Sequence, residues 1–151
     1  MSGTKLLAEN RKARFEYTII DSLEFGMVLE GTEVKSIKSA QFAFGDAWIE
    51  LDNVGELWMR NLHINPYKMA GLANHDPDRR KKLLAHNAEI KKLRRQIDEK
   101  GFTLIPLDFH LKNGRIKVTV GLCKGKKQYD KRDSIKAKDQ KRDLDRELRR
   151  P

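Results

Sequence analysis

The sequence is poor in the features that mark secreted, membrane and disulfide-stabilised proteins. Its 151 residues include one cysteine, so an internal disulfide is excluded and a reducing compartment is expected. No apolar run approaches the ~20 residues that a membrane-spanning helix needs. The first residues, Met-Ser-Gly-Thr-Lys, lead into no hydrophobic segment of a secretory signal. We therefore expect a soluble, cytoplasmic protein of one domain with no membrane partner.

Motifs for catalysis and cofactor binding are also missing. The chain has no P-loop, no GxGxxG and no GxSxG, and its four histidines form no metal-ligand pattern. Cys123 ends a strand-like segment and is interpreted as an inert core thiol, although a nucleophilic role with a distant histidine stays open. These absences favour no cofactor and no metal. A metal nuclease would need a carboxylate cluster, for which the candidates are Glu30, Glu33, Asp46 and Asp108.

Positive charge is abundant and lies in two places. The chain has 32 Lys/Arg against 22 Asp/Glu, a net charge of +10. Residues 77–100 carry nine Lys/Arg against four acids and residues 125–151 carry eleven against six, while the remainder balances at twelve each. Two dense basic blocks indicate phosphate-binding surfaces and therefore a nucleic-acid partner. For either block alone, a solvated helix face is an open alternative.

The apolar pattern predicts mainly antiparallel strands. Residues 15–29 are rich in β-formers, and residues 46–52 and 57–64 read as a hairpin. Asn113-Gly114 is a type I′ turn signal that joins a strand over 102–111 to the alternating segment 115–122. Pro106 within that strand implies a sheet edge or a bulge. About five strands with a helix between them suggest a closed or partly closed small barrel.

Two helices are predicted, and both ends of the chain are expected to lack structure. Thr32 is a candidate cap for a short helix over 33–39, for which a plain connecting loop is the alternative. Asp76-Pro77 begins a long helix, and Gly101 ends it; the apolar residues of its buried face are Leu83, Ile90, Leu93 and Ile97. Residues 1–9 are expected to be frayed. The tail has only five apolar residues, so we expect it to be disordered when free and helical when bound, or alternatively a permanent helix packed on the core.

Two side chains, of which Tyr129 lies in the second basic block, suggest base recognition. Glu33 can accept from base amino or ribose hydroxyl groups, or it is simply a helix N-terminal acid stabilised by the dipole. Tyr129 stands alone in a basic run and is suited to stacking on a base, or it anchors the tail by hydrophobic contact.

Four stretches of the sequence together resemble a known family. They are Asn10-Arg11-Lys12-Ala13 with Tyr17, Gly31-Thr32-Glu33-Val34-Lys35-Ser36-Ile37, Arg80-Lys81-Lys82-Leu83-Leu84, and Gly125-Lys126-Lys127-Gln128-Tyr129-Asp130-Lys131-Arg132. The second and fourth stretches are specific, and the order is kept along nearly the whole chain. From about residue 10 to residue 150, the chain resembles the bacterial SsrA-binding protein (small protein B) family.

The resemblance implies a fold and a function. The fold is an OB-type antiparallel β-barrel over 1–124, with one long and one or two short flanking helices, followed by a basic tail over 125–151. The family binds the tRNA-like domain of transfer-messenger RNA and delivers it, with elongation factor Tu, to ribosomes stalled without a stop codon, a process called trans-translation. The tail becomes helical in the empty mRNA channel beside the decoding centre. The resemblance implies a monomer that catalyses nothing.

The resemblance also assigns residues by position. The transfer-messenger RNA would be bound by Asn10, Arg11, Lys12, Glu33, Lys35, Leu84 and His86, the last two being placed on the long helix. The ribosome would be bound by Lys126, Lys127, Tyr129, Asp130, Lys131, Arg132, Lys138 and Arg142. Tyr129 replaces a histidine of many members and keeps a planar ring, and His86 replaces an asparagine of some members and keeps hydrogen-bonding capacity.

Two other classes of protein share part of this pattern. A ribosomal protein or a general OB-type RNA chaperone would have the same basic blocks and barrel. A small metal-dependent nuclease would need the carboxylate cluster that the sequence does not require.

Overall fold

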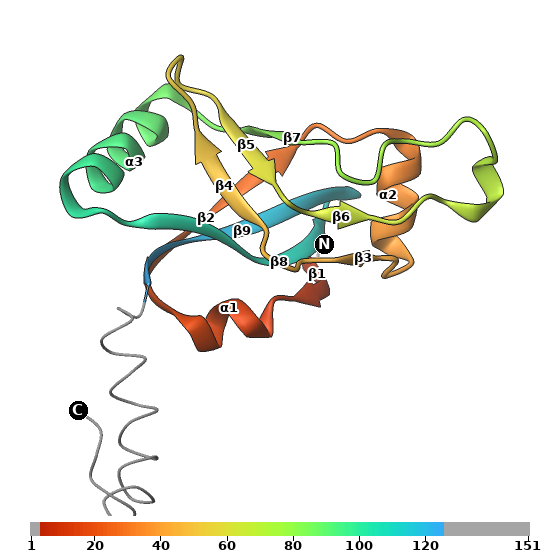
Figure 1. Ribbon diagram of the computed structural model, residues 1–151, viewed down its shortest axis with the longest axis horizontal. Coiled ribbons are helices and arrows are strands. Elements are labelled where there is room, and N and C mark those ends of the chain that lie inside the picture. The colour runs from red at the N-terminus through yellow and green to blue at the C-terminus, as the bar shows by residue number, and fades with distance from the viewer. Residues whose placement is uncertain (1–3, 126–151) are drawn as a thin grey trace, which may run out of the picture.

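The computed structural model of the chain describes residues 4–125, and six of its strands close into a barrel. All pairings are antiparallel: the ring runs β8-β4-β5-β7-β2-β9, and β9 pairs back onto β8 (Figure 1). The mainly antiparallel β fold with helices predicted from the sequence is thereby confirmed. The barrel strands are β2 (Tyr17–Met27), β4 (Trp48–Leu51), β5 (Leu57–Arg60), β7 (Lys81–Leu84), β8 (Thr103–Lys112) and β9 (Arg115–Gly125).

Three further strands lie outside the ring. The first, β1 (Thr4–Glu9), pairs with the outer half of β8, so the expectation that residues 1–9 are frayed is wrong for 4–9. The hydrogen-bonding partner lies a hundred residues away, and no local pattern signals such a pairing. The strands β3 (Phe42–Ala43) and β6 (His63–Ile64) form a small second sheet.

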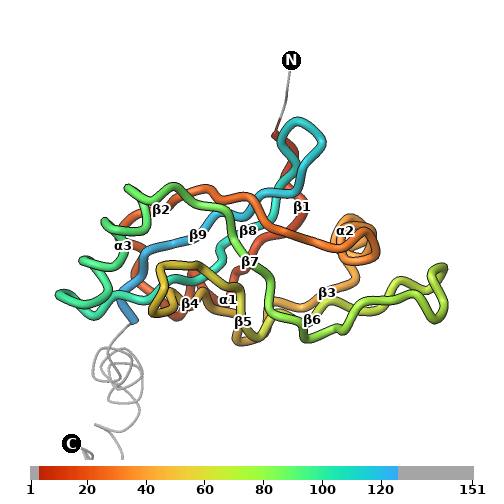
Figure 2. The backbone as a smooth tube through the Cα atoms, turned by 90° about the horizontal axis from the view of Figure 1, so that it is seen from above, coloured from red at the N-terminus to blue at the C-terminus, as the bar shows by residue number. Residues whose placement is uncertain are grey.

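The β8–β9 hairpin follows the sequence prediction closely. Asn113 and Gly114 have φ of 54° and 77°, as a type I′ turn requires. The register shifts between Pro106 and Asp108, so the bulge is the correct reading of the strand proline, because β8 is paired on both sides. The far end of the hairpin, with β1 beside it, projects from the barrel (Figure 2).

The helices are α1 (Arg11–Glu16), α2 (Gly31–Lys38) and α3 (Asn87–Lys100), with a 3₁₀ turn η1 (Lys68–Ala70). The predicted short helix is confirmed as α2 and the predicted stop at Gly101 is confirmed by its φ of 69°. The predicted start of the long helix near residue 77 is wrong, because residues 81–84 form β7. Lys81 and Leu83 point into the barrel, and the buried lysine conceals the strand alternation.

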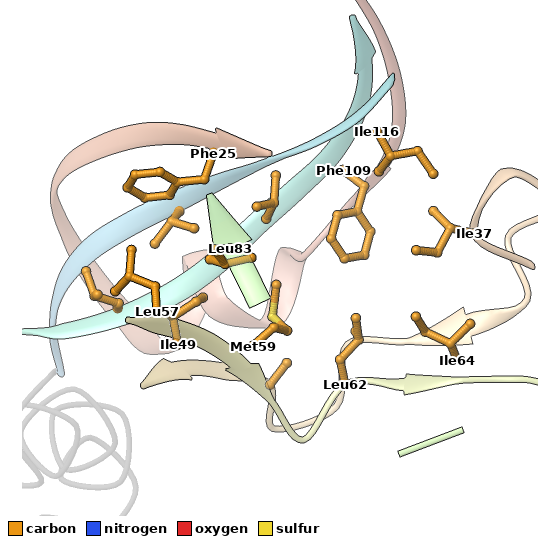
Figure 3. Packing of buried hydrophobic residues seen from close by; sticks show 14 of the residues in the cluster. Phe25, Ile37, Ile49, Leu57, Met59, Leu62, Ile64, Leu83, Phe109 and Ile116 are labelled. Atoms are coloured by element: carbon orange, nitrogen blue, oxygen red, sulfur yellow. The ribbon is translucent and has the colours of Figure 1, made fainter. Parts of the chain in front are cut away.

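The core fills the barrel interior and draws on both ends of the molecule. Phe25 of β2, Ile49 of β4, and Leu57 and Met59 of β5 meet Leu83 of β7 in its middle (Figure 3). Two helices at opposite ends of the barrel close it (Figure 1), and each adds an apolar side chain to the core: Ile37 of α2 and Leu93 of α3.

A smaller apolar cluster fixes α1 to the outside of the barrel. Ala13 of α1 packs with Ile105, Leu107 and Cys123 of β8 and β9. Among residues 4–125, no helix is long and apolar enough to cross a membrane.

Candidate nucleic-acid interface

Asn10 anchors α1 to the bulge in β8. Its side-chain Nδ2 donates to the Pro106 carbonyl at 2.9 Å, and its backbone N–H donates to the Leu107 carbonyl at 2.7 Å. The Asn10 Oδ1 accepts from the Ala13 N–H at 3.2 Å and so caps the helix. Asn10 is therefore buried. Its predicted role at the RNA interface is then indirect: it orients the neighbouring residues of α1.

Arg11 and Lys12 lie on the exposed side of α1. The Lys12 ammonium is 3.2 Å from Asp46, whose hydrogen bond and charge raise the pKa of Lys12, so this side chain is cationic at neutral pH. Beside it, a cleft of about 160 Å³ separates α1 from the start of β4, with Tyr17 and Trp48 in its wall. Cations next to aromatic rings are a combination that suits RNA.

Glu33 is fully buried at the start of α2 and does not face solvent. One oxygen of its carboxylate accepts from the Glu30 backbone N–H at 2.7 Å, and both oxygens accept from the Arg79 guanidinium. Arg79 also contacts the exposed carboxylate of Glu30 at 3.1 Å and donates to the Val28 carbonyl. The Glu33 carboxylate has its hydrogen bonds satisfied within the protein, which makes it an organiser of α2 and of the segment before β7.

Lys35 is an exposed cation on the same helix. Its Nζ lies 5.5 Å from the centre of the Tyr67 ring. Thr32 and His75 tie α2 to the loop between β6 and β7: the Thr32 hydroxyl is 2.7 Å from His75 Nδ1, and His75 Nε2 is 2.9 Å from the Ile64 carbonyl. A carbonyl only accepts, so Nε2 carries the proton. The Thr32 side chain therefore contacts His75. The N-cap position of α2, which the sequence predicts for Thr32, is occupied by Glu30.

Lys81 is the second cation of the first basic block that is used inside the protein. It has no exposed surface, and its Nζ donates to the Leu62 carbonyl at 2.9 Å. Burial lowers its pKa, against the opposing field of Glu33. Residues 77–100 are therefore not one basic helix face, because Arg79 and Lys81 are turned inward and Arg80 and Lys82 are turned outward.

Leu84 lies on the outer face of β7, not on a helix, and is 55% exposed. Its register partner on β2 is Gly26, whose other neighbour is Lys117 of β9. A Cβ built on Gly26 would lie 3.4 Å from Lys117 Nζ and 3.5 Å from Leu84 Cδ1, so both side chains reach over the glycine. The result is an apolar side chain beside an ammonium, and Lys117 has no ion pair within residues 4–125.

His86 immediately precedes α3, so its predicted position on the helix is also wrong. Its backbone N–H donates to Glu89 Oε1 at 2.9 Å, which closes the first turn. The side chain is exposed and follows the end of β7.

The predicted RNA-binding residues fall on separate sides of the barrel. In Figure 1, α1 lies below the sheet, α2 lies at one end, and β7 leads into α3 above it. The structure joins Glu33 to Arg79 and Leu84 to Lys117, and sequence reasoning missed both partners. The sequence gives no signal for this, because residues 79–82 are all basic and so hide which of them the strand turns inward.

The other chemistry considered from the sequence finds no assembled site. Among residues 4–125, no three His, Cys, Asp or Glu side chains gather as metal ligands. The carboxylates considered for a nuclease do not converge on one site: Asp46 pairs with Lys12, Asp108 with His110, and Glu30 and Glu33 share Arg79. Burial raises the pKa of the Cys123 thiol to about 11, so the thiol is protonated at neutral pH. The predicted tail residues, 126–142, lie outside the described part of the chain.

Comparison with known proteins gives a consistent result. The family model described as SmpB protein matches residues 7–150. An SsrA-binding protein of Treponema pallidum is 52% identical over 147 residues, which cover 97% of this chain and 95% of the relative. One of Streptococcus pneumoniae is 47% identical over 145 residues, covering 96% and 93%. A chain in the solved structure "tmRNA-SmpB: a journey to the center of the bacterial ribosome" is similar with a TM-score of 0.69 and 41% identity, covering 86% of this chain and 92% of that one.

Proposed function

Because this chain belongs to the SmpB protein family, we propose that it binds the tRNA-like domain of transfer-messenger RNA and delivers it to stalled ribosomes for trans-translation. The observation that carries this proposal is the fixed display of Arg11 and Lys12: α1 is anchored at Asn10, and both cations point to solvent. The relatives are named for SsrA binding, and the similar solved structure is described as a tmRNA-SmpB assembly in the ribosome.

The proposed RNA-binding residues divide into two kinds. Arg11, Lys12 and Lys35 are exposed cations that contact phosphates, and Leu84 and His86 form a contact at the junction of β7 and α3. Asn10 and Glu33 are buried and act as positioning residues: they hold α1 and α2, respectively, in place.

The remaining parts of the proposal concern the ribosome. The basic tail over 125–151 enters the mRNA channel when the channel holds no mRNA. The tail residues that contact the ribosome there are Lys126, Lys127, Tyr129, Asp130, Lys131, Arg132, Lys138 and Arg142. The body over 1–124 acts as a monomer, reaches the ribosome with elongation factor Tu through the RNA, and works in the cytoplasm. Its role is binding, with no reaction catalysed.

The test separates the body from the tail. We expect the full chain to capture transfer-messenger RNA from a bacterial lysate far above bulk RNA of equal length, as read by sequencing the bound RNA. Removal of residues 126–151 leaves affinity for the isolated RNA nearly intact and abolishes tagging on stalled ribosomes. A tail deletion that loses most of the affinity for the free RNA contradicts this division.

Two controls distinguish the competing classes. A general RNA chaperone or ribosomal protein would retain bulk RNA as well as transfer-messenger RNA. A metal-dependent nuclease would cleave the RNA, and EDTA would stop the cleavage. In addition, the measured affinity should fall with added salt, because each phosphate contact releases counterions.

A further inference from the structure

The outer face of β4, β5 and β7 carries an arginine stacked on a tryptophan, outside the set of residues assigned above. The Arg80 guanidinium lies 3.8 Å from the centre of the Trp58 ring. Arg80 is exposed and Trp58 is half-buried, so the ring forms the floor and the guanidinium plane faces solvent.

The ring beneath Arg80 is held in place. Trp58 Nε1 donates to Asp52 Oδ2 at 2.9 Å, and the other oxygen of Asp52 accepts backbone N–H groups of Val54 and Glu56. These hydrogen bonds lower the pKa of Asp52, so this carboxylate stays charged as an acceptor. The indole is therefore fixed by the β4–β5 turn, and a planar guanidinium on a fixed ring is pre-organised.

Charge on this face distinguishes Arg80 from its neighbours. Arg60 is paired with Glu50 at 2.6 Å, and Lys82 with Glu56 at 2.8 Å. Within residues 4–125, Arg80 has neither an ion-pair nor a hydrogen-bond partner, so its N–H donors and one face of its plane are available.

The position connects this stack to the proposed RNA surface. Lys82 and Leu84 point outward from β7, and Arg80, immediately before the strand, continues the same alternation. Trp58 is the register partner of Lys82, so the stack extends the face that begins at Leu84 toward β5. A ligand that lies along Leu84 meets Arg80 two strand positions beyond Lys82.

We propose that Arg80, held on Trp58, binds an unpaired nucleotide of the RNA. The base stacks on the free face of the guanidinium, and the outward N–H groups donate to the neighbouring phosphate or to the base edge. This inference rests on the proposed function, since it names a further binding residue for the same RNA. It gives a role to Arg80, which has no acidic partner within residues 4–125, on a face where Arg60 and Lys82 are each paired with a glutamate.

The test compares variants that separate charge from stacking. Arg80→Lys keeps the positive charge and removes the plane, Arg80→Ala removes both, and Arg115→Ala is the matched control, an exposed arginine on the projecting β8–β9 hairpin. The probe is a synthetic tRNA-like domain of transfer-messenger RNA. We expect about tenfold weaker binding for both Arg80 variants, and an unchanged salt dependence for Arg80→Lys. Thermal unfolding of each variant should match that of the wild type, because Arg80 is exposed.

A spectroscopic readout tests the stack directly. In a Trp48→Phe background, Trp58 is the one remaining tryptophan of the chain, and its emission should change on RNA binding and fail to change after Arg80→Ala. Binding by Arg80→Lys equal to the wild type would show charge alone and overturn the inference, as would Trp58 emission that ignores saturating RNA. A wild-type chain that does not bind this RNA would overturn the proposed function together with the inference.

Discussion

The α2 end and the α1 side of the molecule (Figure 1) use pairs of opposite charges in different ways. Under α2, the Glu33 carboxylate is fully buried against Arg79, which is itself 29% exposed. Beside α1, Lys12 and Asp46 are paired at 3.2 Å with both side chains largely in water. Burial makes the first pair part of the fold, because either charge would be stranded without the other. Solvent screens the second pair, which leaves Lys12 available to a phosphate.

Substitution of Glu33 should have the largest effect. Glu33→Ala leaves the Arg79 guanidinium without its main partner, and we expect the free energy of unfolding to fall by about 3 kcal/mol. Chemical denaturation measures this loss, and RNA affinity should fall with it because α2 and the segment before β7 lose their tie. Glu30→Gln is the matched control: it removes the charge of an exposed carboxylate beside the same arginine, keeps a side-chain oxygen at the helix cap, and should cost below about 1 kcal/mol. Equal losses for the two variants would refute the distinction.

Removing the cationic side chain of Arg11 should weaken RNA binding without destabilising the fold. Arg11 is exposed on α1, so Arg11→Ala should change the free energy of unfolding by under about 0.5 kcal/mol. RNA affinity should fall by about fivefold, and the salt slope should decrease by about one phosphate contact. A filter-binding series at several salt concentrations measures both, and an unchanged slope would remove Arg11 from the proposed interface.

His110 lies between the buried Glu33–Arg79 pair and the exposed Lys12–Asp46 pair in its exposure to solvent. Burial opposes its protonation, but hydrogen bonds to Glu24 at 2.6 Å and Asp108 at 2.9 Å outweigh burial and raise its pKa above the ordinary 6.5. Its stabilising contribution is therefore complete below pH 6.5 and is lost as the pH rises through the raised pKa. His110→Gln keeps hydrogen-bonding capacity without titrating. The wild type should lose stability over this range and the variant should not; parallel unfolding curves from pH 6 to 8 would contradict the assignment.

The smallest expected effect comes from Asp46. Asp46→Asn removes the negative charge that Lys12 faces, so RNA should bind about twofold more tightly. The thermal midpoint should not move, since both side chains lie in water. Lys12→Ala in the same background should abolish the gain. A gain that persists without Lys12 would place its origin elsewhere.

The parts of the fold that the sequence predicts are those with local signals. Asn113-Gly114 specifies its turn, and the alternation from Ile116 to Leu122 specifies its strand, because both depend on neighbouring residues. Residues 81–84 were misread, because buried Lys81 looks solvent-facing, and Leu83 matches the helical spacing of the apolar residues after it. The strand over 4–9 exists through its pairing with β8, for which the sequence carries no local mark.

The candidate RNA-binding site also contains residues whose exposure follows from local sequence and residues whose burial does not. Arg11, Lys12 and Lys35 are exposed, since charged residues on short amphipathic helices face water, and their contact with RNA is still a prediction. The burial of Glu33 was beyond sequence reasoning, because its partner Arg79 lies 46 residues away and carries no sign of its direction. How the tail residues act is still a prediction.

The bulge at Pro106 affects how much conformational entropy α1 loses when its cations bind a ligand. Two carbonyls at this bulge, those of Pro106 and Leu107, accept from Asn10, so α1 can leave the barrel only if both of these hydrogen bonds break. The amide proton of Asn10 should then exchange with solvent as slowly as those of β8 itself. A helix of six residues would melt in isolation, but here it is kept folded before any encounter, and little ordering entropy is left to lose on contact.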